Sequence, residues 1–167
     1  MVAQETALDA RRVVDALKRA GATHVIWLPD SESGFLYHAL TQDSGLRLVP
    51  VSREGETFGI AAGLLLGGKR PVIIIQSTGF FESGDSVRGL GIELSLPLVL
   101  LIGYRGYESG GPLTDTAAIY LQPILDAWGI PHSVMETDED AELIVRAQQE
   151  ANARSGMVAV LIGKEYR

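Results

Sequence analysis

The segment 52–56 places two carboxylates, Glu54 and Glu56, between an apolar run of strand character and a helix rich in small residues. Acidic side chains in the first turn of a helix commonly do no more than complement the helix dipole. The helix that follows, however, carries small residues that would let another backbone approach closely: Gly59, Ala61, Ala62 and Gly63. A carboxylate at the end of a strand, next to a helix suited to close contact, favours a site shared across an interface.

The segment 76–84 is the second candidate for chemistry. In its plainest interpretation it is a loop that connects a strand to a helix, with Ser83 as the N-cap residue. It also contains two adjacent aromatic residues, Phe80 and Phe81, which are unusual in a solvent-exposed loop. These rings either line a pocket for a cofactor or substrate or pack beneath the next helix, and the sequence leaves both alternatives open.

Two further segments hold weaker candidates. Pro29, Asp30 and Ser31 follow the first apolar run, where they form either a simple turn or one wall of a site. Arg105 is the only basic residue in the glycine-rich segment 103–116, which we expect to be a loop. Its guanidinium is either solvated or binds a carboxylate or sulfonate through two hydrogen bonds. Asp115 is placed to cap the helix that follows.

The elements that position these residues alternate along the chain. Two capping-box patterns begin helices, one from Thr6 to Asp9 and one from Thr137 to Asp140, and Gly21 has the position of a glycine that ends a helix. Strands are predicted at 24–28, 46–51, 72–75, 98–102, 132–135 and 157–162, and helices at 10–20, 35–40, 53–66, 83–94, 117–128 and 137–155.

The predicted strands are mostly continuous apolar runs, which is typical of a sheet buried on both faces. Their alternation with helices predicts a doubly wound α/β fold, with a mainly parallel sheet of about six strands and helices on both faces. The length of 167 residues suits one domain, so we expect residues 1–167 to form a single unit. Ligands of such folds bind at the carboxyl ends of the strands, where all four candidate segments lie.

The composition excludes several classes of protein. The formal charge is −7, from 14 basic and 21 acidic residues, which argues against nucleic acid and anionic membranes as partners. Because there is no cysteine, disulfides, thiolate metal sites and cysteine nucleophiles are excluded. We expect a cytoplasmic protein, since the chain has neither the apolar core of a signal peptide nor a run of membrane-spanning length. No metal site is predicted, because the three histidines lack the spacing of ligands: His24, His38 and His132.

Several motifs, taken in order, resemble the pyrimidine-binding (PYR) domain of thiamine-diphosphate enzymes. They are Arg53-Glu54, Gly59-Ile60-Ala61-Ala62-Gly63, Gly68-Lys69-Arg70-Pro71 and Gln76-Ser77-Thr78-Gly79, supported by Pro29-Asp30-Ser31, Tyr104-Arg105-Gly106 and the segment 125–131. The resemblance covers nearly the whole chain. It is greatest to the alpha chain of sulfopyruvate decarboxylase and to the N-terminal half of phosphonopyruvate decarboxylase.

This resemblance implies a catalytic role for Glu54. A glutamate at this point in the family hydrogen-bonds the ring nitrogen N1′ of the aminopyrimidine, so that the exocyclic nitrogen of the cofactor can take the proton from the thiazolium ring. The family spacing favours Glu54 over Glu56 for this role. The resemblance also places further residues at the cofactor, namely Gln76, Ser77, Thr78, Gly79 and Phe80. It places another set on the substrate side, namely Pro29, Asp30, Ser31, Phe81 and Arg105.

The chain departs from the family pattern in the segment 76–84. Ser77 stands where the resembling enzymes have asparagine, and Phe80-Phe81-Glu82 replaces small residues. This departure makes a bulkier or aromatic 2-oxo acid a possible substrate.

The family motif that holds Mg²⁺ and the diphosphate, Gly-Asp-Gly followed by asparagine, is missing. Its nearest counterpart is Gly84-Asp85-Ser86, and the only asparagine is Asn152. The resemblance therefore implies a partner: a beta-type chain with a diphosphate-binding (PP) domain, which carries Gly-Asp-Gly and holds Mg²⁺. We expect a hetero-oligomer that contains a dimer of heterodimers, with the small-residue face around Gly59 and Gly63 in the contact.

The resulting hypothesis is the alpha (PYR) subunit of a two-chain, thiamine-diphosphate-dependent 2-oxo acid decarboxylase. Three alternatives stay open. The chain could serve a carboligase or lyase of the same family that acts on a bulkier or aromatic substrate. It could be a non-catalytic scaffold or regulatory member of that family. It could also be an independent α/β domain that binds a small ligand.

Overall fold

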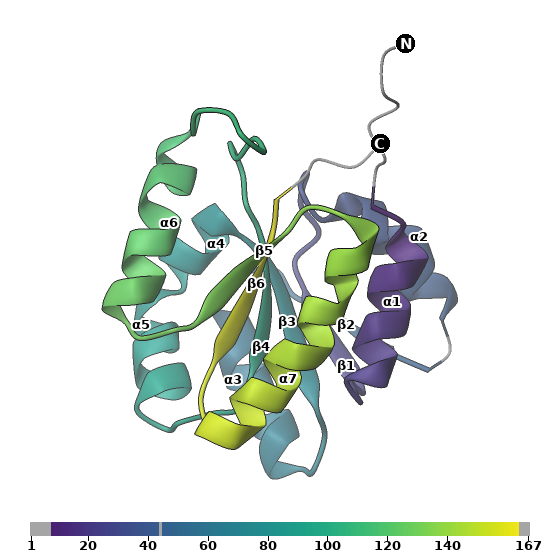
Figure 1. The fold of residues 1–167 in the computed structure, drawn as a ribbon. Helices are drawn as coiled ribbons and strands as arrows, with labels where there is room; N and C mark the ends of the chain where they lie inside the picture. Colours follow the sequence, from purple (N-terminus) through teal and green to yellow (C-terminus); the bar gives the residue numbers. More distant parts are fainter. Residues whose placement is uncertain (1–7, 44, 164–167) are drawn as a thin grey trace.

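A six-stranded sheet, all of whose strands are parallel, forms the centre of the molecule (Figure 1). The computed structural model describes residues 8–43 and 45–163. The strand order is β2-β1-β3-β4-β6-β5. The strands are β1 (His24–Trp27), β2 (Arg47–Pro50), β3 (Pro71–Gln76), β4 (Val99–Gly103), β5 (His132–Met135) and β6 (Val158–Ile162). The predicted doubly wound α/β fold with a parallel sheet is confirmed.

Helices cover both faces of this sheet (Figure 1). One face carries α1 (Ala10–Arg19), α2 (Tyr37–Gln42) and α7 (Glu142–Arg154). The other face carries α3 (Glu56–Leu66), α4 (Ser77–Glu82), α5 (Gly84–Ser86), the π-helical segment Val87–Ile92 and α6 (Thr116–Ala127). Within the described ranges, no helix has the length and apolar character needed to cross a membrane.

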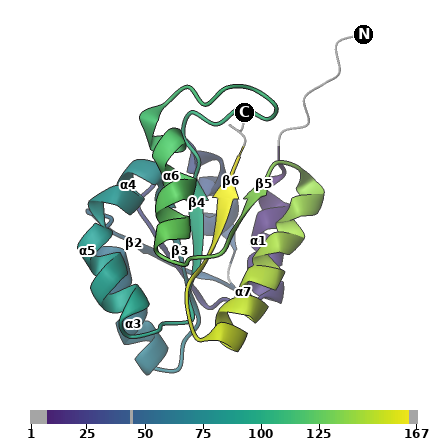
Figure 2. The same ribbon diagram turned by 60° about the vertical axis from the view of Figure 1, so that its left-hand side comes forward.

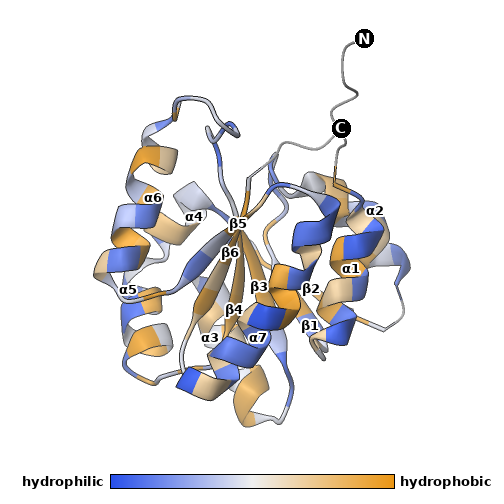
Figure 3. Ribbon diagram, viewed as in Figure 1, coloured by the Kyte–Doolittle hydropathy of each residue, from blue (hydrophilic) through white to orange (hydrophobic). Residues whose placement is uncertain are grey.

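The central strands are apolar along their whole length because their alternate side chains enter two different cores. In β3, Val72 and Ile74 belong to the core beneath α1 and α7, whereas Ile73 and Ile75 belong to the core beneath α3 and α6. All four side chains are fully buried. Figure 3 shows the same arrangement, with hydrophobic strands inside and hydrophilic residues on the outer sides of the helices. The continuous apolar runs of the sequence therefore reflect burial on both faces.

The first helix, α1, begins at Ala10, as predicted. Asp9 is its N-cap, and the carboxylate of Asp9 accepts a hydrogen bond from the backbone N–H of Arg11 at 2.9 Å. Thr6, the predicted cap, lies outside the described residues. At the other end, Gly21 has a φ of +79°, as predicted for a glycine that terminates a helix. The capping box of Thr137 and Asp140 is confirmed, and it opens a 3₁₀ turn that leads into α7.

Two predictions at the carboxyl edge of the sheet are wrong in detail. Helix α3 begins at Glu56 rather than at residue 53, so Glu54 lies in the turn before the helix. The segment 76–84 is not a loop, because α4 follows directly on β3. Ser83 does not cap a helix with its side chain; its Oγ donates a hydrogen bond to the carbonyl of Gly79 at 2.7 Å. Burial of Phe80 in the core stabilises α4 despite its serine, threonine and glycine content.

The candidate segments gather at one end of the sheet. Strand β1 lies between β2 and β3, so the chain crosses from one side of β1 to the other there, and ligands of doubly wound folds bind at such a switch point. Figure 2 shows the segment between β4 and α6 arching above the end toward which β6 points. Residues 104–115 of that segment form neither helix nor strand, which confirms the predicted loop.

We expect Asp9→Ala to lower the free energy of unfolding by about 1 kcal/mol, because the first backbone N–H groups of α1 lose their side-chain acceptor. Asp9→Asn keeps an acceptor oxygen at the cap and serves as the control, with a stability close to that of the wild type. Urea denaturation of the three proteins measures the difference. Equal stabilities of Asp9→Ala and Asp9→Asn would contradict this assignment of the cap.

Candidate active site

The structure brings Glu54 and Gly79 into direct contact, although they follow different strands. Glu54 is half-buried in the turn between β2 and α3. Its side chain lies against Gly79 of α4, so that a Cβ atom added to Gly79 would stand 2.4 Å from the Cγ and 2.6 Å from the Oε1 of Glu54. Real Cβ atoms essentially never come so close to another atom. The position of the carboxylate therefore depends on a glycine at residue 79.

The backbone of Glu54 is fixed by Thr57. The carbonyl of Glu54 accepts hydrogen bonds from the N–H of Thr57 at 3.0 Å and from its hydroxyl at 2.6 Å, and Thr57 is fully buried. Glu56 is different: it is exposed, and its carboxylate accepts a hydrogen bond from the N–H of Ser52 at 3.3 Å. Of the two carboxylates considered from the sequence, Glu54 lies against α4 and Glu56 lies on the surface.

The three polar residues at the junction of β3 and α4 differ in their partners. Gln76 donates a hydrogen bond to the carboxylate of Glu32 and accepts one from the hydroxyl of Thr78 at 2.5 Å. Ser77 is fully buried, and its Oγ has no hydrogen-bond partner among the described residues. A buried hydroxyl without a partner costs free energy, so it is a place where a ligand or a partner chain can supply the missing bond.

The turn after β1 is closed by Asp30. Its carboxylate accepts hydrogen bonds from the N–H of Glu32 at 2.8 Å, from the N–H of Ser33 at 3.0 Å and from the hydroxyl of Ser33 at 2.5 Å. Ser33 in turn accepts a hydrogen bond from the indole N–H of Trp27 at 2.8 Å. Burial raises the pKa of Asp30 above its ordinary value of 3.8, while the hydrogen bonds from Ser33 and Glu32 oppose this rise. Pro29 stands exposed beside this network.

Glu32 is the residue at this edge that the sequence reasoning missed. It is buried, and its carboxylate accepts hydrogen bonds from the hydroxyl of Ser31 at 2.8 Å and from Gln76. Its Cβ lies 2.8 Å from the place where a Cβ of Gly103 would be, at the end of β4. Glu32 thus joins the ends of β1, β3 and β4. The sequence did offer a signal for it, because Glu32 is the third polar residue in a row, after Asp30 and Ser31, in the segment that follows the first strand.

Arg105 already has an anionic partner in this structure. Its guanidinium forms an ion pair with Asp115 at 3.1 Å, and both side chains are partly exposed. Asp115 is also the N-cap of α6, as predicted, because its carboxylate accepts a hydrogen bond from the N–H of Ala117 at 2.8 Å. A substrate anion at Arg105 would share the guanidinium with this cap.

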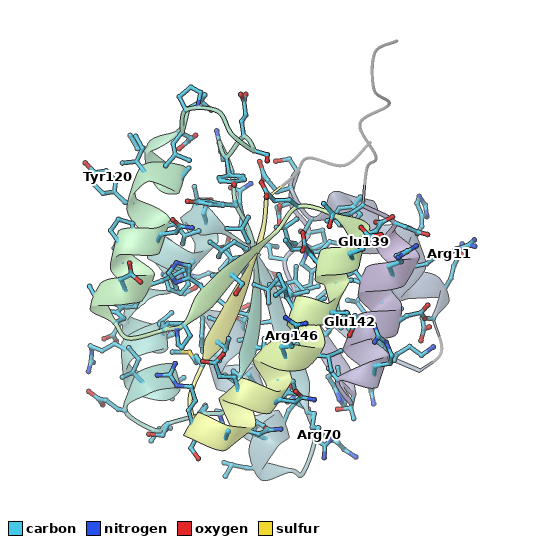
Figure 4. All side chains as sticks on the ribbon, in the orientation of Figure 1. Arg11, Arg70, Tyr120, Glu139, Glu142 and Arg146 are labelled. Carbon is cyan, nitrogen blue, oxygen red and sulfur yellow. The ribbon has the colours of Figure 1, made fainter. Side chains whose placement is uncertain are left out.

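Of the two alternatives for the phenylalanines, packing in the core holds for Phe80 and lining a groove holds for Phe81. Phe80 is fully buried, and its ring centroid lies 5.7 Å from that of Trp128, so this side chain belongs to the core. Phe81 is half-buried and lines a groove of about 680 Å³ between α4 and α6. Tyr120, whose side chain points away from α6 in Figure 4, lines the same groove. The rest of the lining consists of Thr78, Gly84, Asp115, Thr116, Ala117, Ile124 and Trp128.

The residues present fit one half of a thiamine-diphosphate site. The carboxylate of Glu54 lies at the carboxyl edge of the sheet beside Gly79, and Gly79 follows two residues after Ser77, whose buried hydroxyl lacks a partner among the described residues. Over the ranges that the structure describes, no three His, Cys, Asp or Glu side chains gather in a way that could hold a metal ion.

We expect Gly79→Ala to lower the free energy of unfolding by about 1–3 kcal/mol, because the new methyl group overlaps Glu54. In the Glu54→Ala background the three nearest obstructing atoms are absent, and the same change should cost little. Thermal or urea denaturation of the two single variants and the double variant measures this coupling. Equal costs of Gly79→Ala in both backgrounds would show that Glu54 does not lie against this glycine.

The raised pKa of Asp30 predicts a pH dependence of stability. Because the folded protein holds this proton more tightly than the unfolded chain does, the contribution of Asp30 is present below pH 3.8 and is lost as the pH rises through the folded-state pKa. The unfolding free energy of Asp30→Asn, relative to the wild type, should therefore increase between about pH 3 and pH 7. Urea denaturation over this range measures it.

Asp43→Asn is a control of opposite sign, because the hydrogen bond from Lys18 lowers the pKa of Asp43. If the Asp30→Asn difference were constant with pH or fell, Asp30 would not have a raised pKa.

Comparison with known proteins gives sulfopyruvate and phosphonopyruvate decarboxylases, and also 2-succinyl-5-enolpyruvyl-6-hydroxy-3-cyclohexene-1-carboxylate synthase of Rhodococcus erythropolis, which is 36% identical over 112 residues that cover 62% of this chain and 20% of that protein. The chain is 27% identical over 135 residues to sulfopyruvate decarboxylase subunit alpha of Methanocaldococcus jannaschii, with 80% of each chain covered. It is 25% identical over 134 residues to sulfopyruvate decarboxylase of Methanosarcina acetivorans, which covers 80% of this chain but 34% of that protein. It is 29% identical over 99 residues to phosphonopyruvate decarboxylase of Streptomyces viridochromogenes, which covers 59% of this chain and 25% of that protein.

No family model matches the chain. The chain spans about a third of the length of the Methanosarcina protein, whereas it covers most of the Methanocaldococcus alpha subunit. The resemblance predicted from the motifs is confirmed by these relatives, and the parallel sheet agrees with it. The chain is a homologue of sulfopyruvate decarboxylase alpha subunits and of phosphonopyruvate decarboxylase, consistent with a PYR-type domain of the thiamine-diphosphate enzymes.

Proposed function

We propose that this chain is the alpha, PYR-type subunit of a two-chain, thiamine-diphosphate-dependent 2-oxo acid decarboxylase, a carbon–carbon lyase. The single observation that carries the proposal is the contact between Glu54 and Gly79, which holds a carboxylate at the edge where ligands of this fold bind. The relatives named sulfopyruvate decarboxylase support the type of reaction. Residues 1–167 act as a single domain in this proposal.

Glu54 acts on the pyrimidine end of the cofactor. Its carboxyl group would hold the aminopyrimidine through a hydrogen bond to the ring nitrogen N1′ and would exchange a proton there. When bound, the cofactor supplies an electron-accepting thiazolium carbon for decarboxylation. Gly79 leaves the carboxyl group the space to lie flat against the helix, and the hydroxyl of Ser77 gains a partner on assembly. Gln76 and Thr78, together with the backbone of Phe80, border the same end of the helix.

The remaining half of the site belongs to a partner. A beta-type chain with a PP domain and a Gly-Asp-Gly motif holds the diphosphate and Mg²⁺ in this proposal, since carboxylate and amide oxygens are the ligands that Mg²⁺ prefers. The Methanosarcina relative is named sulfopyruvate decarboxylase without mention of a subunit, and this chain matches about a third of it, which supports a division of the enzyme into two parts. Exposed apolar side chains on the α3 side of the molecule, Leu66 and Leu94 among them, suit burial in such a contact. The assembly contains a dimer of heterodimers and lies in the cytoplasm.

The substrate is a small 2-oxo acid that enters beside the segment 29–31, Phe81 and Arg105. A specific observation favours a second candidate, a lyase or carboligase of the same type acting on a bulkier or aromatic substrate. The groove between α4 and α6 is lined by Phe81, Tyr120 and Trp128, and Asp115 already occupies the guanidinium of Arg105. An apolar side chain fits this lining better than a sulfonate does.

The experiment is reconstitution of the chain with its PP-domain partner. Carbon dioxide release from sulfonated, phosphonated and aromatic 2-oxo acids is measured for each chain alone and for the pair, with thiamine diphosphate and Mg²⁺. Activity that requires both chains is the expected result. A tightly bound, fully active cofactor on this chain alone would refute the two-chain arrangement, and an aromatic preference would select the second candidate.

We expect Glu54→Gln to lower kcat of the pair by about 100-fold or more, because the amide cannot exchange a proton with N1′. Glu56→Gln, two residues away on the surface, is the matched control and should leave kcat within about twofold of the wild type. Steady-state kinetics of both variants check the expectation. Full turnover by Glu54→Gln would remove Glu54 from the mechanism.

A further inference from the structure

The side chain of Glu82, at the end of α4, reaches the turn that carries Glu54. One carboxylate oxygen, Oε1, forms an ion pair with the guanidinium of Arg53. The other, Oε2, accepts a hydrogen bond from the backbone N–H of Gly55 at 3.0 Å. Both oxygens of Glu82 are therefore used, and they bind the two residues that flank Glu54 in the chain.

The same face of α4 makes every one of these contacts. Gly79 and Glu82 are three residues apart, a spacing that places them on one side of a helix. Gly79 lies against the side chain of Glu54, and Glu82 binds the backbone and side chain on either side of it. Gly79 lets the carboxylate of Glu54 approach α4. Glu82, three residues further along the same helix, holds the segment that carries Glu54 against α4.

The N-cap residue of α3 makes no side-chain cap hydrogen bond. Gly55 is the N-cap residue of α3, and glycine has no side chain that could accept a hydrogen bond from the first turn. The carboxylate of Glu82 accepts a hydrogen bond from the N–H of Gly55 itself, and so ties the N-cap residue of α3 to α4. The bond from Gly55 N–H to Glu82 is charge-assisted and stronger than a bond between neutral groups.

The contribution of Glu82 to global stability should nevertheless be small. The side chain of Arg53 is 72% exposed and that of Glu82 is 32% exposed, and an ion pair so open to solvent stabilises little. The contacts instead restrict the conformations of one exposed turn. This restriction matters at the carboxylate in the middle of the turn, whose position must be accurate for proton exchange.

We propose that Glu82 is a positioning residue that holds Glu54 in place through Arg53 and Gly55, a role that rests on the function proposed for Glu54. Glu82 belongs to the stretch Phe80-Phe81-Glu82, in which the chain departs from the pattern of the resembling enzymes. In this proposal, one residue of that departing stretch, Glu82, fixes the turn that carries Glu54.

The first test measures the turn itself, without cofactor. Hydrogen exchange of the Gly55 amide is followed by NMR in the purified full-length chain. Glu82→Ala should accelerate exchange by about tenfold or more, because the amide loses its acceptor and the turn opens more often. Glu142→Gln is the matched control: Glu142 pairs with Arg19 on the opposite face of the sheet and is labelled on α7 in Figure 4. An unchanged Gly55 rate in Glu82→Ala would overturn the proposal.

The second test asks whether Glu82 acts through Glu54. In the reconstituted pair, Glu82→Ala should lower kcat by about tenfold and leave KM within about twofold, while Glu82→Gln, which keeps one acceptor oxygen, should recover part of the loss. In the Glu54→Gln background, Glu82→Ala should lower kcat by less than about twofold further. If the Glu54→Gln rate is too low to measure, the affinity of the same four proteins for thiamine diphosphate is compared in place of kcat.

The outcomes separate the two proposals. An equal loss from Glu82→Ala in both backgrounds means that Glu82 acts independently of Glu54 and overturns the positioning role. A wild-type kcat in Glu82→Ala has the same consequence. Full activity of Glu54→Gln refutes the proposed role of Glu54, while the exchange rate of the Gly55 amide still reports on the contact with Glu82.

Discussion

The contact between the carboxylate of Glu54 and the bare backbone of Gly79 is the constraint on which the site depends. A carboxyl group that exchanges a proton with a ligand must be held at a fixed place, and here the place is defined by the absence of one carbon atom. The turn that carries Glu54 follows β2 and the glycine follows β3, with β1 between the two strands. Only the parallel sheet, which brings the carboxyl ends of these strands to one edge, lets them meet.

Helix α4 serves three purposes because its successive residues point in different directions. Gly79 and Glu82 face the turn of Glu54, whereas Phe80 enters the core against Trp128 and Phe81 lines the groove toward α6. A helix of six residues has little intrinsic stability. Burial of Phe80 supplies the anchor that lets the polar and small residues of α4 serve the site. A loop with the same residues would not hold these directions.

Several large apolar side chains are exposed on the face of the molecule that carries α3 and α6. Leu66, the last residue of α3, is 91% exposed at the end of that helix away from Glu54. The buried hydroxyl of Ser77 has no partner among the described residues, and the lining of the α4–α6 groove is mostly apolar. The alpha subunits among the relatives are named as subunits, which implies a second chain in those enzymes.

The sequence by itself determined the architecture. Apolar runs of strand length alternate with helical segments. A strand that is buried on both faces is apolar at every position, so its own sequence is enough to reveal it. The sequence also predicted the capping of α6 by Asp115, which is local, and through the family resemblance it gave Glu54 and Gly79 as candidate site residues. The tertiary structure decided what depends on neighbours distant in the chain. Residues 77–82 form a helix because Phe80 packs against Trp128. Glu32 belongs to this edge because it contacts Gln76 and the position of Gly103. Glu82 reaches the turn beside Glu54 for the same reason: contacts between different strands' ends are fixed by the packing of the sheet, and no local pattern of residues encodes them.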